Sequence, residues 1–448
     1  MRISFAYPSL LALTSIPSAL SFPSSNPSHH RVPGDADEPI ALYKTIAQIQ
    51  ARVASGTFIR PRDAARQPVD VSGAHAFAAP DFDAGDQRGP CPGLNALANH
   101  GYIDRTGITT FTEALAAVHD IYNMDIDLGT VLITLALVFT GSPLSLNPQF
   151  SIGGADARVA DLLLDGILLG PPRGLDGSHN FIETDGSLTR DDLYVTGNAW
   201  DMNMTKFLEV YRWGGVDSPL TSDDVGDIAA ARWQEAVATN PYFWYGPLTG
   251  YLPRTGGFAL TARTMSNYSE GSLQGVITKD MFKSFFAVVD DATAASGMVY
   301  QRGHERMPDN WFRRPIPWGL VDLNLDVLKW SERHPFLLDV GGNTGEINTF
   351  TGLDLSNITG GLLNTASLLE GNNLICFSLE IAKTFGPNSL STLYKLLSVP
   401  AGILTDALST PLLDLSCPVY ADLSDQGDGI AASLLATYPG AQKAGSAL

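Results

Sequence analysis

The sequence predicts a mostly α-helical fold in a single large domain, with long loops and few or no strands. Apolar residues recur at helical spacing in several segments, whereas the alternating, β-branched runs that a sheet requires are nearly absent. The chain has 448 residues and 44% of them are hydrophobic, which is enough to bury a large core. No internal repeat and no clear interdomain linker is visible, so we expect one domain.

The first 60 residues are predicted to precede that domain. Residues 1–21 have an arginine near the start, an apolar stretch and small residues at the end, as a secretory signal does. Residues 22–60 are predicted to be a mobile leader, rich in Ser, Pro and His as far as about Asp37, followed by a helix over Pro39 to Val53. The folded domain is then residues 61–448, and Thr57 to Arg88 is predicted to be an extended arm.

Helices are predicted at eight places, counting Pro39 to Val53, besides the helix start after Cys91 described below. The second begins with a capping box formed by Thr110 and Glu113, after which apolar residues recur at helical spacing as far as Tyr122. The others are predicted at Leu128 to Phe139, Met204 to Trp213, Asp224 to Thr239, Lys279 to Ser296, Asn373 to Thr384 and Leu390 to Leu397.

The charge of the chain argues against nucleic acid and membrane partners. Lys and Arg number 28 against 47 Asp and Glu, a net charge of -19, which repels nucleic acid and anionic lipid. The longest apolar run after the signal, Val131 to Phe139, is too short to cross a bilayer and is better explained as a core helix.

Three cysteines in a secreted chain imply one disulfide and one free thiol. Cys376 and Cys417 lie near each other toward the C-terminus, so we expect them to pair and leave Cys91 free. Closing a loop of about 40 residues stabilises a fold by roughly 4 kcal/mol in the chain-entropy model. Acceptor sequons at Asn203, Asn267 and Asn357 predict glycosylation in the secretory pathway.

Cys91 lies between Pro90 and Pro92 and is followed by a predicted helix start. A thiolate is the form that binds metal, and the unpaired backbone donors of a helix start lower a cysteine pKa. Pro92 suits the first helical turn, where its missing N–H has no partner to lose. The pattern therefore predicts a metal-binding cysteine, and its alternative is a small buried cysteine in a Pro/Gly turn.

Glu183-Thr184-Asp185 with Ser187 predicts a second metal site. A hard cation such as Mg²⁺ takes oxygen ligands, and a carboxylate, a backbone carbonyl and a hydroxyl within five residues supply three of them. The alternative is an acidic turn that caps a helix starting near Thr189.

These two motifs together resemble the fungal haem-thiolate peroxidases, the family of chloroperoxidase and the unspecific peroxygenases. Further resemblances lie at Gly197-Asn198 through Asn203, Ala238-Thr239-Asn240-Pro241, Arg306-Met307-Pro308 through Arg313, and Gly345-Glu346-Ile347-Asn348. The resemblance implies a mostly helical domain that binds haem b, and it also matches a C-terminal disulfide at the positions of Cys376 and Cys417.

The resemblance assigns roles to the two motifs. Cys91 is expected to be the proximal haem-iron ligand next to Pro92, donating electrons that favour cleavage of a peroxide O–O bond, with the following backbone donors tuning that donation. Glu183, the carbonyl of Thr184 and Ser187 are expected to hold Mg²⁺ or Mn²⁺ beside a haem propionate. Relatives have Gly or His where this chain has Thr184. His179 is expected to lie near the propionates, and His100 to have a structural hydrogen-bonding role.

Aromatic and apolar residues near Asn240-Pro241 are candidates for the distal wall of the haem pocket. They are Phe243, Trp244, Tyr245, Leu248 and Tyr251, of which Phe243 and Trp244 are our predicted cofactor contacts. The alternative for the whole cluster is ordinary core packing.

The chain departs from the family at the distal acid-base group. Relatives use a glutamate, paired in the peroxygenases with an arginine, and the corresponding positions here hold Thr249 and Gly256. No acidic residue occurs from Ala236 to Ser269. The candidates for catalysis are therefore Glu235, Glu270 and Arg254, of which Arg254 can stabilise negative charge but cannot act as a base. The alternative for Glu235 is a solvated helix face.

The sequence thus predicts a secreted haem-thiolate peroxidase or peroxygenase that uses hydrogen peroxide on a small organic substrate, with halide oxidation as a side activity. One alternative is a haem-binding relative with lost or altered turnover, and another is a cysteine hydrolase with Cys91 as nucleophile and His100 as base. HExxH, GxSxG and phosphate-loop motifs are absent. The segment after about Gly360, including Leu396 to Leu415, is assigned to a substrate channel or a homodimer contact.

Overall fold

The computed structural model describes residues 67–143, 145, 147–159, 171–215, 217–268, 275–359, 362–364, 367, 370–385, 417 and 432–443. The chain divides into two compact units, Met1–Glu38 and Pro39–Leu448, and the described residues all belong to the second. The signal, the leader with its helix at Pro39 to Val53, the boundary near residue 60, the helix at Leu390 to Leu397 and the segment Leu396 to Leu415 lie outside the described residues.

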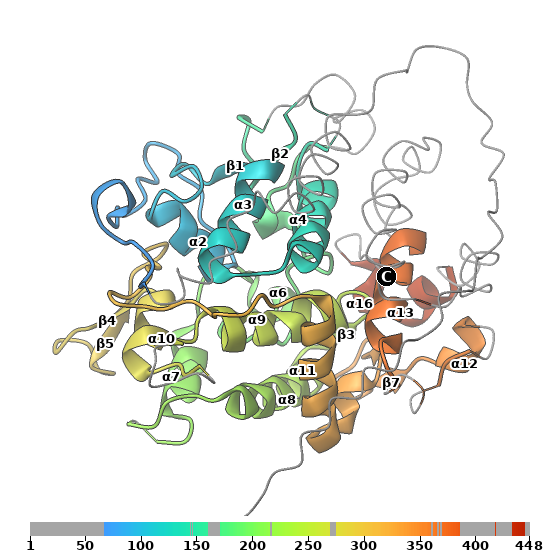
Figure 1. Ribbon diagram of the computed structural model, residues 1–448. Helices are drawn as coiled ribbons and strands as arrows, with labels where there is room; N and C mark the ends of the chain where they lie inside the picture. The colour runs from blue at the N-terminus through green and yellow to red at the C-terminus, as the bar shows by residue number, and fades with distance from the viewer. Residues whose placement is uncertain are drawn as a thin grey trace, which may run out of the picture. The chain divides into compact units, whose positions relative to one another are not determined.

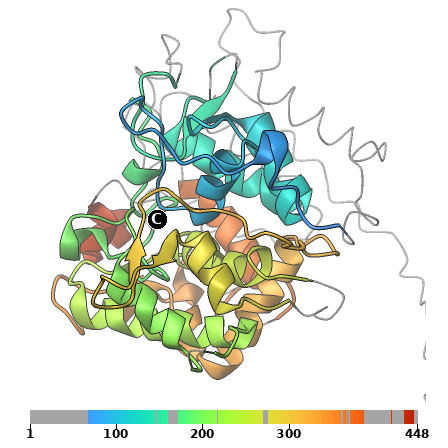
Figure 2. The same ribbon diagram turned by 90° about the vertical axis from the view of Figure 1, so that its left-hand side faces the viewer.

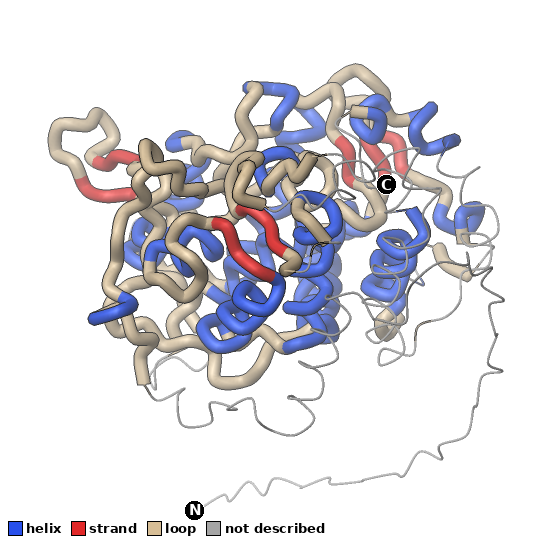
Figure 3. Tube along the Cα trace, turned by 90° about the horizontal axis from the view of Figure 1, so that it is seen from above, coloured by secondary structure: helices blue, strands red, loops and turns tan. Residues whose placement is uncertain are grey.

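Helices dominate the described chain, as predicted, and its strands are short. The strands form three small antiparallel sheets, which Figure 3 shows as separate groups. β1 (Ile108–Thr110) pairs with β2 (Gln149–Ser151), and β4 (Val288–Asp290) pairs with β5 (Met298–Tyr300). β6 (Gly341–Gly342) lies between β3 (Trp244–Tyr245) and β7 (Thr351–Gly352).

The first group of helices contains α2 (Pro92–Asn99), α3 (Phe111–Tyr122) and α4 (Ile126–Thr140). The predicted capping box of α3 is present, because the Thr110 hydroxyl accepts from the Glu113 amide and the Glu113 carboxylate accepts from the Thr110 amide. α3 ends at Asn123, whose left-handed backbone lets α4 fold back against it. Gly129 makes that contact close, since a Cβ there would lie 2.7 Å from Leu115 Cδ1.

The second group of helices contains α6 (Leu193–Thr196), α7 (Met204–Arg212), α8 (Ser222–Thr239), α9 (Gly256–Thr264), α10 (Lys279–Phe285) and α11 (Leu320–Arg333). A π-helical turn, η4 (Gly250–Thr255), leads directly into α9 and contains Pro253. In Figures 1 and 2 the blue-to-teal helices of the first group lie on one side, and the green-to-orange helices α8, α9 and α11 lie on the other.

Shorter elements complete the fold. They are the 3-10 turns η2 (Gly73–His75), η3 (Leu175–Gly177) and η5 (Pro335–Leu338), and the helices α12 (Leu355–Ile358), α13 (Asn373–Phe385) and α16 (Pro439–Gln442). The predicted disulfide is present, because Cys376 in α13 is bonded to Cys417. Cys91 is the free cysteine, as expected. Within the described residues no helix is both long and apolar enough to cross a membrane.

Several predicted helix bounds need correction. The helix predicted over Lys279 to Ser296 ends at Phe285, because Ala287 takes a left-handed backbone and the β4–β5 hairpin follows. α9 and α11 were not predicted. The arm from residue 67 to Arg88 has little regular structure apart from η2, as expected.

Candidate active site

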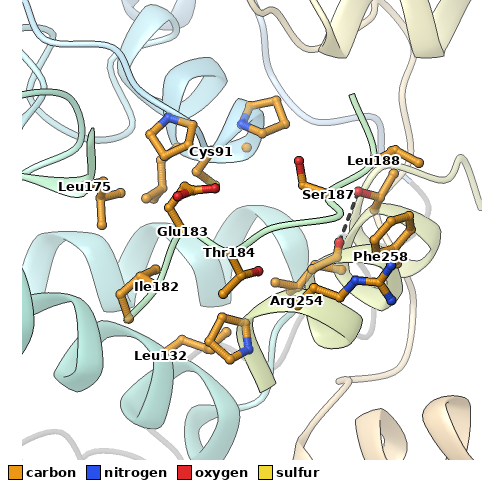
Figure 4. Close-up of a pocket in the computed structure, with 18 of the residues that line it drawn as sticks. Cys91, Leu132, Leu175, Ile182, Glu183, Thr184, Ser187, Leu188, Arg254 and Phe258 are labelled. Atoms are coloured by element: carbon orange, nitrogen blue, oxygen red, sulfur yellow. Dashed lines mark hydrogen bonds between the residues drawn. The ribbon is translucent and has the colours of Figure 1, made fainter. Parts of the chain in front are cut away.

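A cavity of about 260 Å³ lies between the two groups of helices. Its lining comes from the start of α2, from the inner face of α4, from the loop at 182–190, and from η4 and α9. Most of the lining side chains are apolar, and the 183–190 loop contributes the largest group of polar ones, with Arg254, Thr261 and Thr264 on the wall formed by η4 and α9. In the view of Figure 4 this loop lies between Cys91 and Arg254. The geometry is that of a buried site for a largely apolar molecule with a polar edge.

Cys91 caps the start of α2, and Pro92 is the first residue of that helix, as predicted. Asn95 fixes the turn before it, because the Asn95 side chain accepts from the Gly89 amide at 3.1 Å and donates to the Gly89 carbonyl at 2.9 Å. Gly89 has no room for a side chain, since a Cβ there would lie 2.2 Å from the Ile152 carbonyl oxygen. The turn therefore holds Cys91 at the cavity wall.

The protonation of Cys91 corrects one expectation. Burial raises the pKa of the Cys91 thiol, although hydrogen bonds from the Leu94 and Gly93 amides and the charge of Arg190 oppose the shift. The helix start thus acts in the predicted direction, but desolvation outweighs it. The residue's accessible surface faces the cavity rather than bulk water. A metal that binds the sulfur would have to displace its proton.

The acidic loop is held by its own backbone contacts. The Glu183 amide donates to the Ser178 hydroxyl at 3.1 Å, and the Gly186 amide donates to Asp192 Oδ1 at 2.7 Å. Asn240, at the end of α8, donates to the other oxygen of Asp192. No helix begins near Thr189, because α6 starts at Leu193, so the interpretation of this loop as a helix cap is not supported.

The loop leaves several buried polar atoms without a hydrogen-bond partner among the described residues, although His179 Nε2 lies 3.8 Å from Asp185 Oδ1 as an ion pair. They are Glu183 Oε1, both carboxylate oxygens of Asp185, and His179 Nε2. Glu183 Oε2 accepts from His179 Nδ1 at 2.7 Å. Burial raises the pKa of Asp185, and the charge of Asp192 adds to this effect. Burial lowers the pKa of His179, but Asp185 and Glu183 outweigh it and raise that pKa to about 9. A cation at Glu183 would give Glu183 Oε1 the partner that it lacks, in addition to the charge of His179 at the other carboxylate oxygen.

The predicted cation ligands lie together at the cavity. Glu183, Thr184 and Ser187 all line it, and the Ser187 hydroxyl has only a long 3.4 Å bond to the Arg190 carbonyl. The described chain contains no group of three or more His, Cys, Asp or Glu side chains arranged around one point. A site here would therefore combine one carboxylate with neutral oxygens, as the sequence predicted.

The opposite wall is formed by η4 and α9, and Arg254 is its charged residue. Arg254 is buried, with its Nε 3.1 Å from the Gly186 carbonyl and Nη2 2.7 Å from the Ala229 carbonyl. Its guanidinium lies 4.9 Å from the Phe258 ring centroid. Arg254 and Thr261 both line the cavity, seven residues apart, whereas Thr249 and Gly256 do not. The two positions expected for the acid-base pair therefore lie outside the cavity lining.

The structure changes the assignment of the aromatic cluster. Phe243, Trp244, Tyr245, Leu248 and Tyr251 are buried but do not line the cavity, so core packing explains them. Pairing of β3 with β6 turns Trp244 and Tyr245 into the core. The π-helical turn then presents the next residues, Leu252, Pro253 and Arg254, to the cavity. The spacing of Arg254, Phe258, Thr261 and Met265 on one helical face is the sequence signal for this wall.

The acidic candidates Glu235 and Glu270 gain no support. Glu235 lies on α8 outside the cavity lining, and its carboxylate pairs with Arg232 at 2.6 Å and Lys206 at 3.4 Å, as expected for a solvated face. Glu270 lies outside the described residues. Among the described residues that line the cavity, Glu183 is the one carboxylate.

His100 has the structural role that we predicted for it. It is fully buried, its Nε2 accepts from the Met307 amide at 3.1 Å, and its Nδ1 lies 2.7 Å from the His75 carbonyl oxygen. Both ring nitrogens are thus committed to backbone groups, and His100 does not line the cavity. This arrangement argues against a cysteine hydrolase that uses Cys91 and His100.

Comparison with known proteins agrees with this geometry. A family model described as "Peroxidase, family 2" matches residues 75–316. The chain is 47% identical over 381 residues to an aromatic peroxidase (fscJ) of Fusarium equiseti, covering 85% of this chain and 86% of the relative. It is 38% identical to a dothistromin biosynthesis peroxidase (dotB) of Dothistroma septosporum, covering 84% and 87%. An aromatic peroxygenase of Cyclocybe aegerita is 30% identical over 278 residues, covering 60% and 64%.

Proposed function

Because this chain belongs to peroxidase family 2, the fungal haem-thiolate peroxidases, we propose that it uses hydrogen peroxide to oxidise or oxygenate a small aromatic substrate. The observation that carries the proposal is the free Cys91 at the start of α2, facing a cavity whose edge holds Glu183, one of whose buried carboxylate oxygens has no hydrogen-bond partner among the described residues. The aromatic substrate class rests on the names of the relatives and on the apolar lining.

The residues at the cavity fit a haem with a divalent cation at its edge. Cys91 would hold the haem iron through its sulfur, and Glu183, the Thr184 carbonyl and Ser187 would hold Mg²⁺ or Mn²⁺ near a haem carboxylate. When bound, the haem supplies the redox chemistry that cleaves the peroxide O–O bond. The amides of Gly93 and Leu94 would limit the charge on the Cys91 sulfur by hydrogen bonding.

The wall formed by η4 and α9 would bind peroxide and position its proton without contributing a carboxylate. Arg254 supplies a fixed positive charge, and Thr261 supplies a hydroxyl that donates to the Gly257 carbonyl at 3.2 Å. A hydroxyl positions a water or a peroxide proton but does not act as a base at neutral pH. This observation favours the second candidate function, a haem-binding relative with altered turnover.

Isotope labelling separates these functions. The holoenzyme is mixed with ¹⁸O-labelled hydrogen peroxide and a small aromatic hydrocarbon, and the products are weighed by mass spectrometry. A product that carries one ¹⁸O atom indicates oxygen insertion, and unlabelled coupled products indicate one-electron oxidation. If the holoenzyme gives neither product, our proposal is wrong and the second candidate function, a haem-binding relative with altered turnover, takes its place.

We also propose that the protein is secreted and glycosylated, since residues 1–21 resemble a signal and the Cys376–Cys417 disulfide suits an oxidising compartment. Asn203 already caps α7 through its side-chain oxygen, and its amide nitrogen donates to Asp191 at 2.8 Å. A glycan on Asn203 would replace one of the two amide hydrogens, and the remaining one could still donate to Asp191. N-terminal sequencing and glycopeptide mapping of protein from the culture medium test both parts of this proposal.

A further inference from the structure

Arg190, which lines the cavity, forms a buried charged pair with Glu305, which does not line it. Arg190 is 5% exposed and Glu305 is 1% exposed, and Arg190 Nη2 lies 3.6 Å from Glu305 Oε1. Arg190 follows the acidic loop, whereas Glu305 comes from the segment after β5, so the fold brings the two together from distant parts of the chain. Burying both charges is costly, and a pair of this kind contributes little net stability. A role in binding would explain why it is present.

Glu305 is held where it is by backbone contacts rather than by its own charge. Asn99, in the helix that begins at Cys91, donates from its side-chain amide to the carbonyls of Glu305 and Gly303, both at 2.7 Å. Glu305 Oε2 has no hydrogen-bond partner within the described chain. Burial raises the pKa of Glu305, and the charge of Arg190 opposes this shift. The neighbouring guanidinium is thus the main compensation for a buried carboxylate.

The guanidinium of Arg190 has a fixed orientation. Its Nη1 donates to the Thr189 hydroxyl at 2.9 Å, its Nε donates to the Trp200 carbonyl at 3.4 Å, and its Cζ lies 5.7 Å from the Phe286 ring centroid. The contact of Nη2 with Glu305 is an ion pair that is longer than a hydrogen bond. Since an arginine carries five N–H donors, these described contacts leave donors of the fork for a further acceptor.

The place of Arg190 indicates the chemistry of that acceptor. Arg190 lines the same end of the cavity as Glu183 and Ser187, and its charge reaches the Cys91 sulfur. A haem carries two carboxylates, and the cation proposed at Glu183 compensates one of them. An arginine fork matches a carboxylate in a bidentate geometry. Arg254 is the other arginine of the described lining, but its Nε and Nη2 already donate to backbone carbonyls, which leaves Nη1 alone rather than a fork for a carboxylate.

We propose that Arg190 binds a carboxylate of the haem and that Glu305 is a positioning residue that holds the Arg190 guanidinium at the cavity wall. The proposal rests on the haem binding inferred above. It adds a second point of attachment, separate from Cys91 and from the cation loop, at which the protein recognises the cofactor.

The test compares haem with haem dimethyl ester, in which both carboxylates are blocked. Holoenzymes carrying either cofactor are mixed with excess apomyoglobin, and the rate of cofactor transfer is followed by absorbance. The variants are Arg190→Lys, which keeps the charge but loses the fork, and Glu305→Gln, which keeps the shape but loses the charge. Arg263→Lys is the matched control, because Arg263 pairs with the buried Asp326 and does not line the cavity.

We expect Arg190→Lys to release haem about tenfold faster than the wild type, the effect of one charged hydrogen bond. Glu305→Gln should act in the same direction by a smaller factor. With the dimethyl ester both variants should match the wild type, and a merely structural role would not produce this difference. Arg263→Lys should match the wild type with either cofactor.

Other results overturn the proposal. Equal acceleration of Arg190→Lys with haem and with the ester would show that Arg190 only supports the fold. Faster release of haem, but not of the dimethyl ester, in Arg254→Lys instead of Arg190→Lys would show that Arg254 binds the carboxylate. A wild-type protein that binds neither cofactor would contradict the proposed function itself, so the two failures are distinguishable.

Discussion

Arg254 connects the acidic loop to α8, and its replacement by methionine should lower the stability of the fold and the order of the loop. Its guanidinium donates to the carbonyl of Gly186, inside the loop, and to the carbonyl of Ala229 in α8. Gly186 lies between Thr184 and Ser187, the proposed cation ligands. Removing Arg254 therefore frees the backbone that has to hold those ligands still.

The expected loss can be worked out from these contacts. Two hydrogen bonds from a charged donor contribute about 1.5–3 kcal/mol each, or roughly 3–6 kcal/mol together. Burial lowers the pKa of Arg254 to about 10, so the buried charge itself opposes folding. Methionine removes that penalty and fills part of the space. We therefore expect the free energy of unfolding to fall by about 3 kcal/mol, the lower end of the range.

The assay is urea unfolding of the holoenzyme with and without added Mg²⁺, followed by circular dichroism. The stabilisation that Mg²⁺ gives the wild type should be reduced in Arg254→Met, because the loop is less ordered. Arg254→Lys should fall between the two, since one ammonium can keep one of the two contacts. A loss below about 1 kcal/mol together with an unchanged Mg²⁺ effect would refute this reasoning.

Three further outcomes follow from single contacts. Burial lowers the pKa of His100 below its usual 6.5, so the folded chain binds fewer protons than the unfolded chain, and stability should fall as pH drops from about 6.5. His100→Gln should flatten this slope in unfolding curves measured between pH 5 and 7, and an unchanged slope would contradict the assignment. Replacing Cys376 and Cys417 together by serine should cost roughly 4 kcal/mol in denaturant unfolding, the entropy of a loop with a sequence separation of 41, and a loss near zero would show the bridge to be unimportant. Asn203→Ala should cost about 1 kcal/mol through loss of the α7 cap, whereas Asn203→Ser, whose hydroxyl can still cap the helix, should cost less although it also loses the contact with Asp191, and equal melting temperatures for the two variants would contradict the capping role.

Local sequence patterns predicted much of the fold and one side of the site. The capping box at Thr110 and the periodic apolar residues after it define α3, because both signals act within one helix. Cys91 and the Glu183 loop could also be identified as candidate metal ligands. Cys91 is marked by the prolines on either side of it, and Glu183, Thr184 and Ser187 lie within five residues of one another. These features need no knowledge of tertiary packing.

The opposite wall could not be predicted in the same way. Which residues of this wall face the cavity depends on the π-helical turn at Gly250–Thr255 and on the pairing of β3 with β6. Neither of these features has a local sequence signature. The sequence therefore pointed to Phe243 and Trp244, whereas residues a few positions later face the cavity. The pair of Arg190 and Glu305 was also missed, because its members are more than a hundred residues apart.

The central claim, that Cys91 binds haem iron, is tested most directly by the optical spectrum of the purified protein. Spectra are recorded for the ferric form and then for the reduced form with carbon monoxide, in the wild type and in Cys91→Ala. The account predicts a red-shifted carbonyl band, typical of a thiolate ligand, that is absent from the variant. A wild-type protein that stays free of haem when haem is supplied during expression, or a band that persists in Cys91→Ala, would contradict it.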